Sequence, residues 1–222
     1  VYLGNYFGDS EDNKLVFDEI LITRRRLMSL PEVFMPEDFC YLRGAREEMF
    51  FKLLQLHFAP NPVEVMQWLL EHGMASSLAA YGEDEKTAIA IVRQGTMALS
   101  RWTNGIRRKI QSCPGHIDLT NNLKRACFTD DGNLLFVHAS IDKTRPLTMQ
   151  KDQFWWDNGA FDKLDQKFSE FIKVIRGYDH SNSGIDLNGQ FTATIDGGCG
   201  RGGKLHAICF TPDGIKHDEI TS

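Results

Sequence analysis

The sequence predicts a mixed α/β (α+β) sandwich with helices on the outside, and three observations support this fold class. An apolar run at Leu134–Ile141 follows the turn residues 130–133 and has the length and composition of a buried strand. Apolar residues recur at helical spacing from Glu48 to about Ile110. The last third of the chain alternates short apolar runs with glycine-rich turns, which is typical of strands. A chain that mixes strands and helices in this order buries its apolar faces by packing helices against sheets.

The elements before the helical stretch are expected to be short. Val1–Leu3 ends a strand, and residues 14–30 form a helix that Pro31 terminates. Phe39–Arg43 forms a second strand, which breaks at Gly44. The carboxylates that follow Gly44 then lie in the first turn of a helix, where the helix dipole stabilises them.

The elements after the helical stretch are mostly strands. A hairpin joins residues 125–128 to residues 134–138, and an amphipathic helix follows at Asn158–Phe171. The remaining predicted strands are Lys173–Arg176, Phe191–Asp196, Lys204–Phe210 and Ile215–Ile220.

The length and composition of the chain indicate one domain. Its 222 residues, of which 42% are hydrophobic, are enough to bury a substantial core. We therefore predict a single domain over residues 1–222, with a helical insertion at residues 48–112. Because Val1–Leu3 resembles the end of a strand, the first strand of the domain is expected to lie upstream of Val1.

Charge and cysteine content restrict the partners and the compartment. The formal net charge of −5 argues against nucleic acid or an anionic membrane surface as the main partner. No apolar run approaches the ~18 residues that span a bilayer, so no membrane span is expected. The five cysteines are odd in number and scattered, which favours reduced thiols in a cytoplasmic protein over disulfides or a zinc site.

His138 lies at the C-terminal end of the Leu134–Ile141 strand, in the region where open α/β sheets bind ligands. A lone histidine in such a place is more often a core residue that is hydrogen-bonded to the backbone. Its role therefore depends on its surroundings. Polar turns also follow three other predicted strands, at Gly4-Asn5, at residues 44–47 and at Gly177-Tyr178.

This order of turns resembles the calcineurin-like metallophosphoesterases, and especially the bacterial phosphoprotein phosphatases and symmetrical diadenosine tetraphosphate hydrolases. Their turns follow the patterns GD-x-x-DRG, GNH-[DE], VHAG-[IL] and GH, with a closing IDTG strand and a GG-x-L segment. The closing pattern is matched by residues 195–198 and 202–205, and residues 67–73 and 80–82 resemble the family's helical lobe. The resemblance covers nearly the whole chain. It implies a four-layer β-sandwich flanked by helices, a pair of divalent metals and hydrolysis of phosphoric esters.

The chain departs from this pattern at most of the positions where the family holds its metals. Asn5 stands in place of the bridging aspartate, Ala45 in place of a ligating asparagine, and Tyr178 in place of a ligating histidine. Arg46 replaces the proton-donating histidine, and Asp9 replaces the phosphate-binding arginine. Glu47 keeps the acidic position and His138 keeps its ligand identity, whereas the family's first Asp-x-His pair would lie upstream of Val1.

The size of the charge repulsion decides what these departures imply. Two divalent ions about 3.5 Å apart repel each other by about 20 kcal/mol at an effective dielectric constant of about 20. A bridging carboxylate offsets that repulsion, and the neutral side chain of Asn5 does not. The guanidinium of Arg46 stays protonated, so it cannot act as a general acid near neutral pH, and its charge opposes the binding of cations. A binuclear centre is therefore not expected.

Two interpretations of Arg46 remain open. The favoured one is an inactive pocket closed by salt bridges of Arg46 with Glu47, Asp9 or Asp179. The other is an anion-binding pocket formed by Arg46, Arg201 and backbone amides of the glycine-rich loops. Cys199, which lies in one of these loops, is expected to be structural.

We therefore predict a catalytically degenerate metallophosphoesterase-fold protein, a pseudophosphatase that acts as a binding, regulatory or structural subunit. Its partner is expected to be a protein, with a phosphorylated ligand as a further candidate, and no cofactor is expected. The alternative is a divergent, metal-dependent phosphoesterase that acts on a phosphoprotein or a dinucleoside polyphosphate. It would hold at most one weakly bound divalent metal (manganese, iron or zinc) through His138, with Asp179 and His180 as further ligand candidates. The residues of the vestigial pocket would be Asn5, Asp9, Arg46, Glu47, His138 and Tyr178.

Overall fold

A computed structural model describes residues 1–10, 12–30 and 33–222, and these residues divide into two compact units. Unit 1 consists of Val1–Gly4, Cys40–Ala45 and Lys124–Ser222. Unit 2 consists of Asn5–Phe39 and Arg46–Leu123. Pro31, which was expected to end the first helix, lies outside the described residues.

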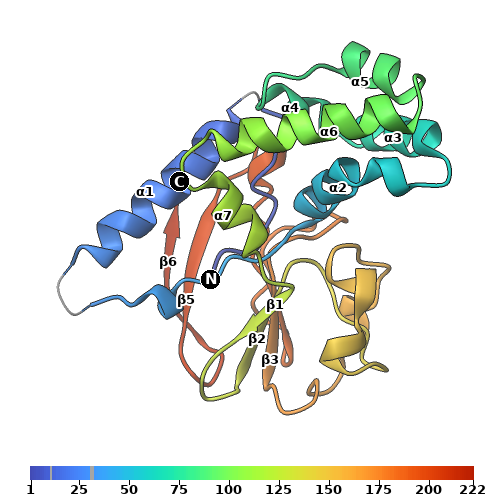
Figure 1. Cartoon of the computed structure of the whole chain (residues 1–222). Helices are drawn as coiled ribbons and strands as arrows, with labels where there is room; N and C mark the ends of the chain where they lie inside the picture. Colours follow the sequence, from blue (N-terminus) through green and yellow to red (C-terminus); the bar gives the residue numbers. More distant parts are fainter. Residues whose placement is uncertain (11, 31–32) are drawn as a thin grey trace. The chain divides into compact units, whose positions relative to one another are not determined.

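The main sheet of unit 1 contains the strand that the apolar run predicts. Its strands lie in the order β1 (Ala126–Phe128), β2 (Leu134–Val137), β3 (Lys173–Arg176) and β4 (Thr192–Thr194). β1 pairs antiparallel with β2, whereas β2 with β3 and β3 with β4 pair in parallel. Figure 1 shows β1, β2 and β3 side by side. The predicted hairpin and the strand at residues 173–176 are confirmed.

Both faces of this sheet are covered by apolar side chains, which explains why the sequence of β2 is apolar without interruption. Leu135, Val137 and Val174 belong to one buried cluster, which also contains Trp155 and other aromatic residues. Leu134, Ile175 and Ala193 form a second cluster. Because successive side chains of a strand point to opposite faces, the alternation between the clusters places one on each side of the sheet.

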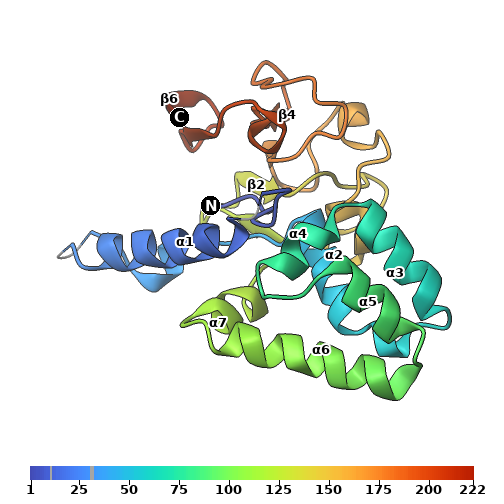
Figure 2. The same cartoon turned by 90° about the horizontal axis from the view of Figure 1, so that it is seen from above.

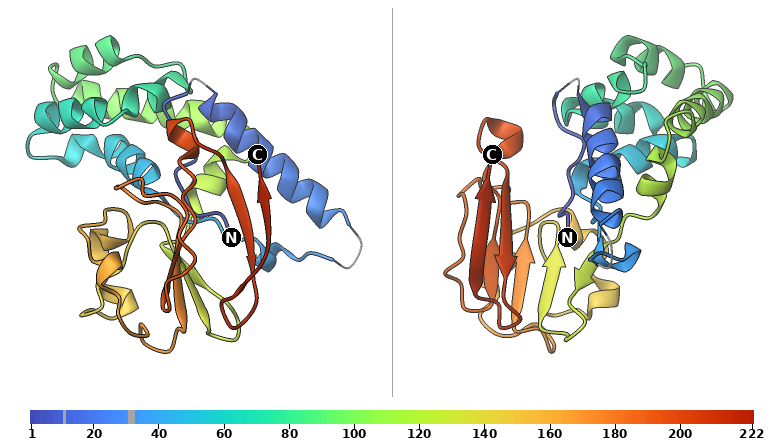
Figure 3. Two further views of the ribbon diagram at one scale, coloured as in Figure 1. Left: turned by 180° about the vertical axis from the view of Figure 1, so that it is seen from behind. Right: turned by 90° about the vertical axis from the view of Figure 1, so that its left-hand side faces the viewer.

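A second, two-stranded sheet ends the chain. β5 (His206–Phe210) and β6 (Lys216–Thr221) pair antiparallel, as the long arrows at the C-terminal end of the chain show in Figure 3. Thr211 closes the connecting turn, because its N–H donates to the carbonyl oxygen of Ile215 over 2.9 Å. The strands that the sequence predicts in this region are confirmed, with bounds that differ by one or two residues.

The predicted amphipathic helix at Asn158–Phe171 is wrong. The structure has a single short 3-10 turn there, η5 (Phe161–Lys163), within an otherwise irregular segment. The carboxylate of Asp157 accepts the N–H groups of Gly159 and Ala160 at 2.9 and 3.1 Å, which holds the chain in a turn. Phe161, Leu164 and Phe168 are buried in the core of unit 1 without forming a helix.

The two N-terminal strands are reduced to isolated bridges. Tyr2 pairs in parallel with Tyr41, and Leu42 pairs in parallel with Lys124. The Tyr41 carbonyl oxygen accepts the N–H of Lys124 at 2.8 Å, which joins this segment to the chain that leads into β1.

Unit 2 is helical, as the spacing of its apolar residues predicts. Figure 2 shows α3, α5 and α6 packed together. Helix α3 begins with Pro62 after Asn61, whose side chain accepts the N–H of Glu64, as the N-cap pattern predicts. The helices are α1 (Asn13–Met28), α2 (Ala45–Leu54), α3 (Pro62–Glu71), α4 (Met74–Ala79), α5 (Glu85–Val92), α6 (Thr96–Gln111) and α7 (His116–Asn121).

Short 3-10 segments lie in the loops of both units. They are η1 (Pro36–Asp38), η2 (Leu56–Phe58), η3 (Leu147–Met149), η4 (Lys151–Phe154), η5 (Phe161–Lys163) and η6 (Cys199–Arg201). The mixed α/β class is confirmed, and the four-layer sandwich remains a prediction. In the part of the chain that the structure describes, no helix combines the length and the apolar character needed to cross a bilayer.

The burial of β2 leads to a first prediction. Leu135 is 0% exposed, so Leu135→Ala should lower the free energy of unfolding by about 2–5 kcal/mol, through lost burial and the cavity left behind. Leu205, which is 63% exposed, provides the matched control. Leu205→Ala should change the free energy of unfolding by less than about 0.5 kcal/mol. Urea unfolding of both variants measures the difference, and equal losses would show that β2 is not the core strand.

Candidate functional site

The residues of the predicted pocket divide between the two units. One group lies in unit 2 and consists of Asn5, Asp9, Arg46 and Glu47. The other group lies in unit 1 and consists of His138, Tyr178, Asp179, His180 and Arg201.

In unit 2, Asn5 and Glu47 hold the N-terminal loop against the start of α2. The side-chain oxygen of Asn5 accepts the backbone N–H of Arg46 at 3.1 Å. In return, the Glu47 carboxylate accepts the N–H groups of Asn5 and Phe7 at 2.8 and 3.0 Å. Glu47 is only 1% exposed, and its charge is stabilised by these donors and by its place in the first turn of the helix. Both side chains therefore serve to fix the backbone of the loop.

Arg46 is paired within the same unit. Its Nη2 lies 2.9 Å from Oδ1 of Asp9, and its Nη1 donates to the carbonyl oxygen of Gly73 over 3.1 Å. The guanidinium thus joins the N-terminal loop to the turn between α3 and α4. Ser76 strengthens the same junction, because its hydroxyl donates to the carbonyl oxygen of Gly8 over 2.6 Å. Of the three carboxylates considered for Arg46, the structure pairs it with Asp9.

In unit 1, His138 follows β2 and is 1% exposed. Its Nδ1 lies 2.7 Å from the carbonyl oxygen of Leu3, which only accepts hydrogen bonds, so the ring proton is on Nδ1. The predicted backbone hydrogen bond of a core histidine is therefore present. Burial lowers the pKa of His138 to about 4, so the ring is neutral at pH 7. Its Nε2 has no hydrogen-bond partner among the residues that the structure describes.

The backbone beside His138 leaves no room for a side chain at Gly4. This glycine has a φ of +92°, and a Cβ there would lie 2.6 Å from the backbone nitrogen of Gly44 and 2.9 Å from Nδ1 of His138. Only glycine combines this left-handed conformation with so close an approach. The presence of glycine at position 4 is therefore explained by its backbone conformation and close packing.

The ring of Tyr178 stacks on that of His138, and Arg201 packs on the ring of Tyr178. The rings of Tyr178 and His138 are stacked, with centroids 5.3 Å apart and planes 5° from parallel. Cζ of Arg201 lies 5.6 Å from the centroid of the Tyr178 ring, a cation–π contact. Nη2 of Arg201 also pairs with Asp196 at 3.1 Å and donates to the carbonyl oxygen of Asp179 over 3.0 Å. Like Arg46, Arg201 already has a carboxylate partner within its own unit.

The two further ligand candidates, Asp179 and His180, differ in their burial. Asp179 is 2% exposed, and its carboxylate accepts hydrogen bonds from Ser181 and Ser183 and pairs with Arg176. Burial by itself raises the pKa of Asp179, but the hydrogen bonds from both serines and the charge of Arg176 bring it well below its ordinary range. His180 is exposed.

Arg176, at the end of β3, was not singled out in the sequence. Its side chain is 4% exposed and reaches three carboxylates, those of Asp157 at 2.8 Å, Asp179 at 3.3 Å and Asp162 at 3.4 Å. Its Nε donates to the Thr194 hydroxyl over 2.9 Å, which links it to β4. An arginine that ends the otherwise buried run of β3, three residues before an aspartate, was the available signal.

Several groups at the positions of the family's metal ligands already have partners within their own unit. Asn5 supplies an amide oxygen that is already hydrogen-bonded, Tyr178 presents a stacked ring, and the carboxylates of Glu47 and Asp179 accept N–H groups. Within either unit, over the described residues, no three His, Cys, Asp or Glu side chains gather closely enough to hold a metal ion. The unpartnered Nε2 of His138 is the feature that fits a metal ligand best.

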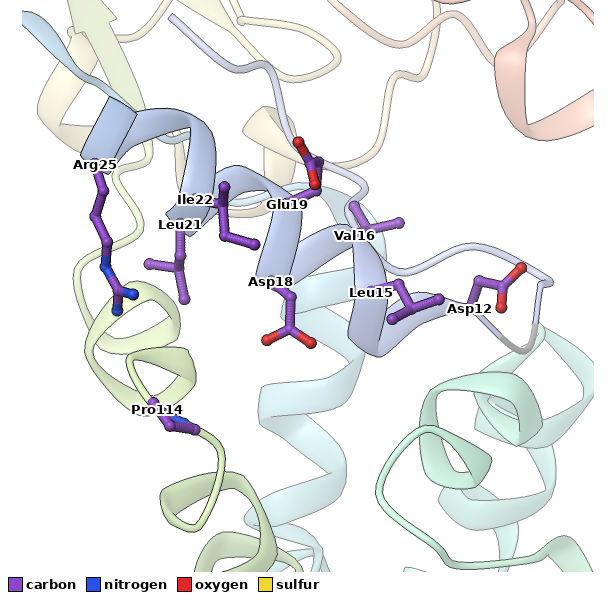
Figure 4. Close-up of a pocket in the computed structure, with 9 residues that line it drawn as sticks. All are labelled: Asp12, Leu15, Val16, Asp18, Glu19, Leu21, Ile22, Arg25 and Pro114. Atoms are coloured by element: carbon purple, nitrogen blue, oxygen red, sulfur yellow. The ribbon is translucent and has the colours of Figure 1, made fainter. Parts of the chain in front are cut away.

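A groove of about 780 Å³ runs along α1 in unit 2, and none of the predicted residues of that unit lines it. Figure 4 shows Leu15, Val16 and Ile22 on α1, with Pro114 from the segment before α7. These three α1 side chains are between 36 and 61% exposed, which gives the groove an apolar wall. Asp18 lines it as well, and its Oδ1 lies 2.9 Å from Nε2 of the buried His116.

Among known proteins, no family model matches this sequence, and no curated protein matches it.

The burial of His138 predicts a pH dependence of stability. Its pKa is about 4 in the folded chain against 6.5 ordinarily, so below pH 6.5 the unfolded chain binds the proton more readily than the folded chain. The contribution of the neutral His138 ring to the free energy of unfolding is complete above pH 6.5. It is lost as the pH falls towards 4, by up to about 1.4 kcal/mol per pH unit. Urea unfolding across this range should show a shallower pH dependence for His138→Gln than for the unmodified chain. Parallel curves would contradict the burial of a neutral imidazole.

The charge network of Arg176 predicts a large effect of its removal. Arg176→Met should lower the free energy of unfolding by about 3–5 kcal/mol, because Asp157 and Asp179 are left buried without their cation. The more exposed pair of Arg145 and Asp142 is the control, and Arg145→Met should cost less than about 1 kcal/mol. Chemical denaturation of both variants provides the comparison. Similar costs would mean that the network adds little beyond a surface ion pair.

Proposed function

We propose that this chain is a calcineurin-like metallophosphoesterase-fold protein that has lost binuclear phosphatase chemistry. In this proposal it acts as a binding, regulatory or structural subunit, and its fold is a four-layer sandwich with helices on the outside. The order of the polar turns and the closing glycine-rich segment support the family. The replaced side chains support the loss of activity.

The observation that carries this proposal is the pairing of Arg46. The residue that stands in place of the family's proton donor is a permanent cation, with Nη2 2.9 Å from Asp9 and Nη1 3.1 Å from the Gly73 carbonyl oxygen. Asp9 in turn stands at the position of the family's phosphate-binding arginine. The charges of Arg46 and Asp9 therefore neutralise each other in an ion pair, and neither side chain is left to act on a substrate.

The remaining members of the unit 2 group support the same conclusion. The Asn5 side chain accepts the backbone N–H of Arg46, and the Glu47 carboxylate accepts the backbone N–H groups of Asn5 and Phe7. A bridging ligand must instead present its oxygens to two cations at once. Here the corresponding amide stabilises the start of a helix, which is a structural role.

A protein partner is the expected binding target, and the groove on α1 supports it. Leu15, Val16 and Ile22 give that surface an apolar character in a chain whose net charge is −5. Contiguous exposed apolar side chains are typical of surfaces that bind other proteins.

One observation favours the alternative, a phosphoesterase that uses a single metal. Nε2 of His138 is buried and has no partner in the described chain, and the proton on Nδ1 leaves its lone pair available. This is the tautomer of a metal-ligating histidine whose other nitrogen is fixed by a backbone carbonyl. In this alternative His138 would hold the ion, and the ion would supply Lewis acidity to a phosphoric ester.

Turnover assays separate the two proposals. The purified protein should not hydrolyse p-nitrophenyl phosphate or diadenosine tetraphosphate above the rate of a blank, with or without added Mn²⁺. His138→Ala serves as the control for any residual rate. Hydrolysis that requires Mn²⁺ and disappears in His138→Ala, together with a stoichiometric metal content, would establish the single-metal phosphoesterase instead.

A further inference from the structure

The groove on α1 presents a row of apolar side chains between two acidic flanks. Leu15 and Ile22 are seven residues apart and therefore lie in one row on the exposed side of the helix. Figure 4 shows Asp18 and Glu19 projecting from opposite sides of α1, with the apolar side chains between them. Asp12 also lines the groove, near the start of the helix. A segment that covers the apolar row therefore meets carboxylates on both sides.

Asp18 is held in place by a buried histidine. Nε2 of His116, which is 0% exposed, lies 2.9 Å from Oδ1 of Asp18, and Nδ1 lies 3.2 Å from the Tyr81 hydroxyl oxygen. Because a carboxylate only accepts hydrogen bonds, Nε2 carries a ring proton, and Nδ1 accepts the Tyr81 hydroxyl. Burial raises the pKa of Tyr81 to about 13, so this hydroxyl keeps its proton. A histidine with a single ring proton thus satisfies both neighbours, and the Asp18 carboxylate keeps its negative charge at the groove.

The other cations of α1 do not neutralise this charge. Among the described residues that line the groove, Arg25 is the single cation, against three carboxylates. Glu19 pairs with Arg26, but at 3.9 Å and with both side chains at least 65% exposed, so water screens the pair. The groove therefore keeps a net negative charge, in a chain whose formal net charge is −5.

A second copy of this chain does not complement the groove. An antiparallel α1 that paired Leu15 of one copy with Ile22 of the other would also place Asp18 opposite Glu19, because the two pairs of positions share one midpoint. A parallel α1 would place each carboxylate opposite itself. Like charges that meet in an interface weaken it. The charges of the groove therefore favour a different chain of opposite charge.

We propose that the groove on α1 binds a basic amphipathic helix of a partner protein. The apolar face of that helix would cover Leu15, Val16 and Ile22, which are all exposed in this chain. Lysine or arginine side chains on both sides of that face would reach Asp18 and Glu19, and the opposite charges would also speed the encounter. This inference rests on the proposed role as a binding subunit, and it specifies the chemistry of the partner.

Selection from a displayed library of random peptides tests the proposal. The peptides have the length of α1, 16 residues, and the unmodified chain is the bait. Leu15→Ser/Ile22→Ser serves as the counter-bait, which removes peptides that bind elsewhere. The enriched peptides should combine apolar residues at helical spacing with an excess of lysine and arginine. Enrichment of acidic peptides, or of no peptide that distinguishes the two baits, would overturn the proposal.

Point variants then separate the charged and apolar contributions, with fluorescence anisotropy of the most enriched peptide as the measurement. Glu19→Lys should weaken binding about tenfold, because repulsion replaces attraction, and Leu15→Ser should weaken it about tenfold through lost apolar burial. Glu71→Lys and Met97→Ser are the matched controls, since both residues are exposed in the same unit and neither lines the groove. Both controls should leave the dissociation constant within about twofold. Equal effects of the groove variants and the controls would contradict the proposed site.

The partner proposal and the proposed function fail in different assays. A dimer in analytical ultracentrifugation that Leu15→Ser/Ile22→Ser dissociates would assign the groove to a second copy and overturn the basic helix. Failure of the peptide selection in a chain that does not hydrolyse p-nitrophenyl phosphate would overturn the partner alone. Hydrolysis that requires Mn²⁺ and His138 would instead overturn the proposed loss of phosphatase chemistry.

Discussion

The buried carboxylate of Glu47 imposes the constraint on which the N-terminal loop depends. A negative charge that is 1% exposed must be surrounded by donors, and here the donors are the backbone N–H groups of Asn5 and Phe7. Satisfying Glu47 therefore fixes the path of the loop next to α2. The loop then brings Asp9 within 2.9 Å of Arg46. The remaining polar contacts of the loop, including that of Gly8 with Ser76, follow from this placement.

Under the proposed family assignment, this constraint accounts for the acidic side chain at Glu47, next to residues that depart from the family pattern. In the proposed family, negative charge in these turns would offset bound cations. In this chain the carboxylates of Glu47 and Asp9 have partners from the protein itself, a pair of backbone amides and a guanidinium. A pocket whose charges are internally compensated folds without an ion. We regard this as the physical basis of the proposed change from catalysis to binding.

The fold could be predicted from the sequence where a local pattern determines the structure. The apolar runs of β2 and β3 and the helical spacing of unit 2 each depend on neighbouring residues alone, and these predictions are confirmed. The helix predicted at residues 158–171 failed because Phe161, Leu164 and Phe168 have helical spacing but enter the core from an irregular chain. The spacing of these residues correctly indicates that their side chains are buried, but it does not determine the backbone conformation.

The candidate site was less predictable because its contacts join distant parts of the sequence. The pairing of Arg46 with Asp9 was one of three options, and no local pattern distinguished them. The hydrogen bond of His138 to the backbone was the more common expectation for a lone buried histidine, and it is present.

The charge network of Arg176 has a consequence for the irregular segment around residues 157–162. This segment has no strand or long helix to hold it, and Asp157 and Asp162 attach it to the sheet through one guanidinium. Its attachment to the sheet is therefore partly electrostatic and is shared with the buried side chain of Phe161, whereas the neighbouring strands are also joined by backbone hydrogen bonds. Acid discharges carboxylates and leaves strand pairing intact, so this part of unit 1 should loosen before the sheet melts.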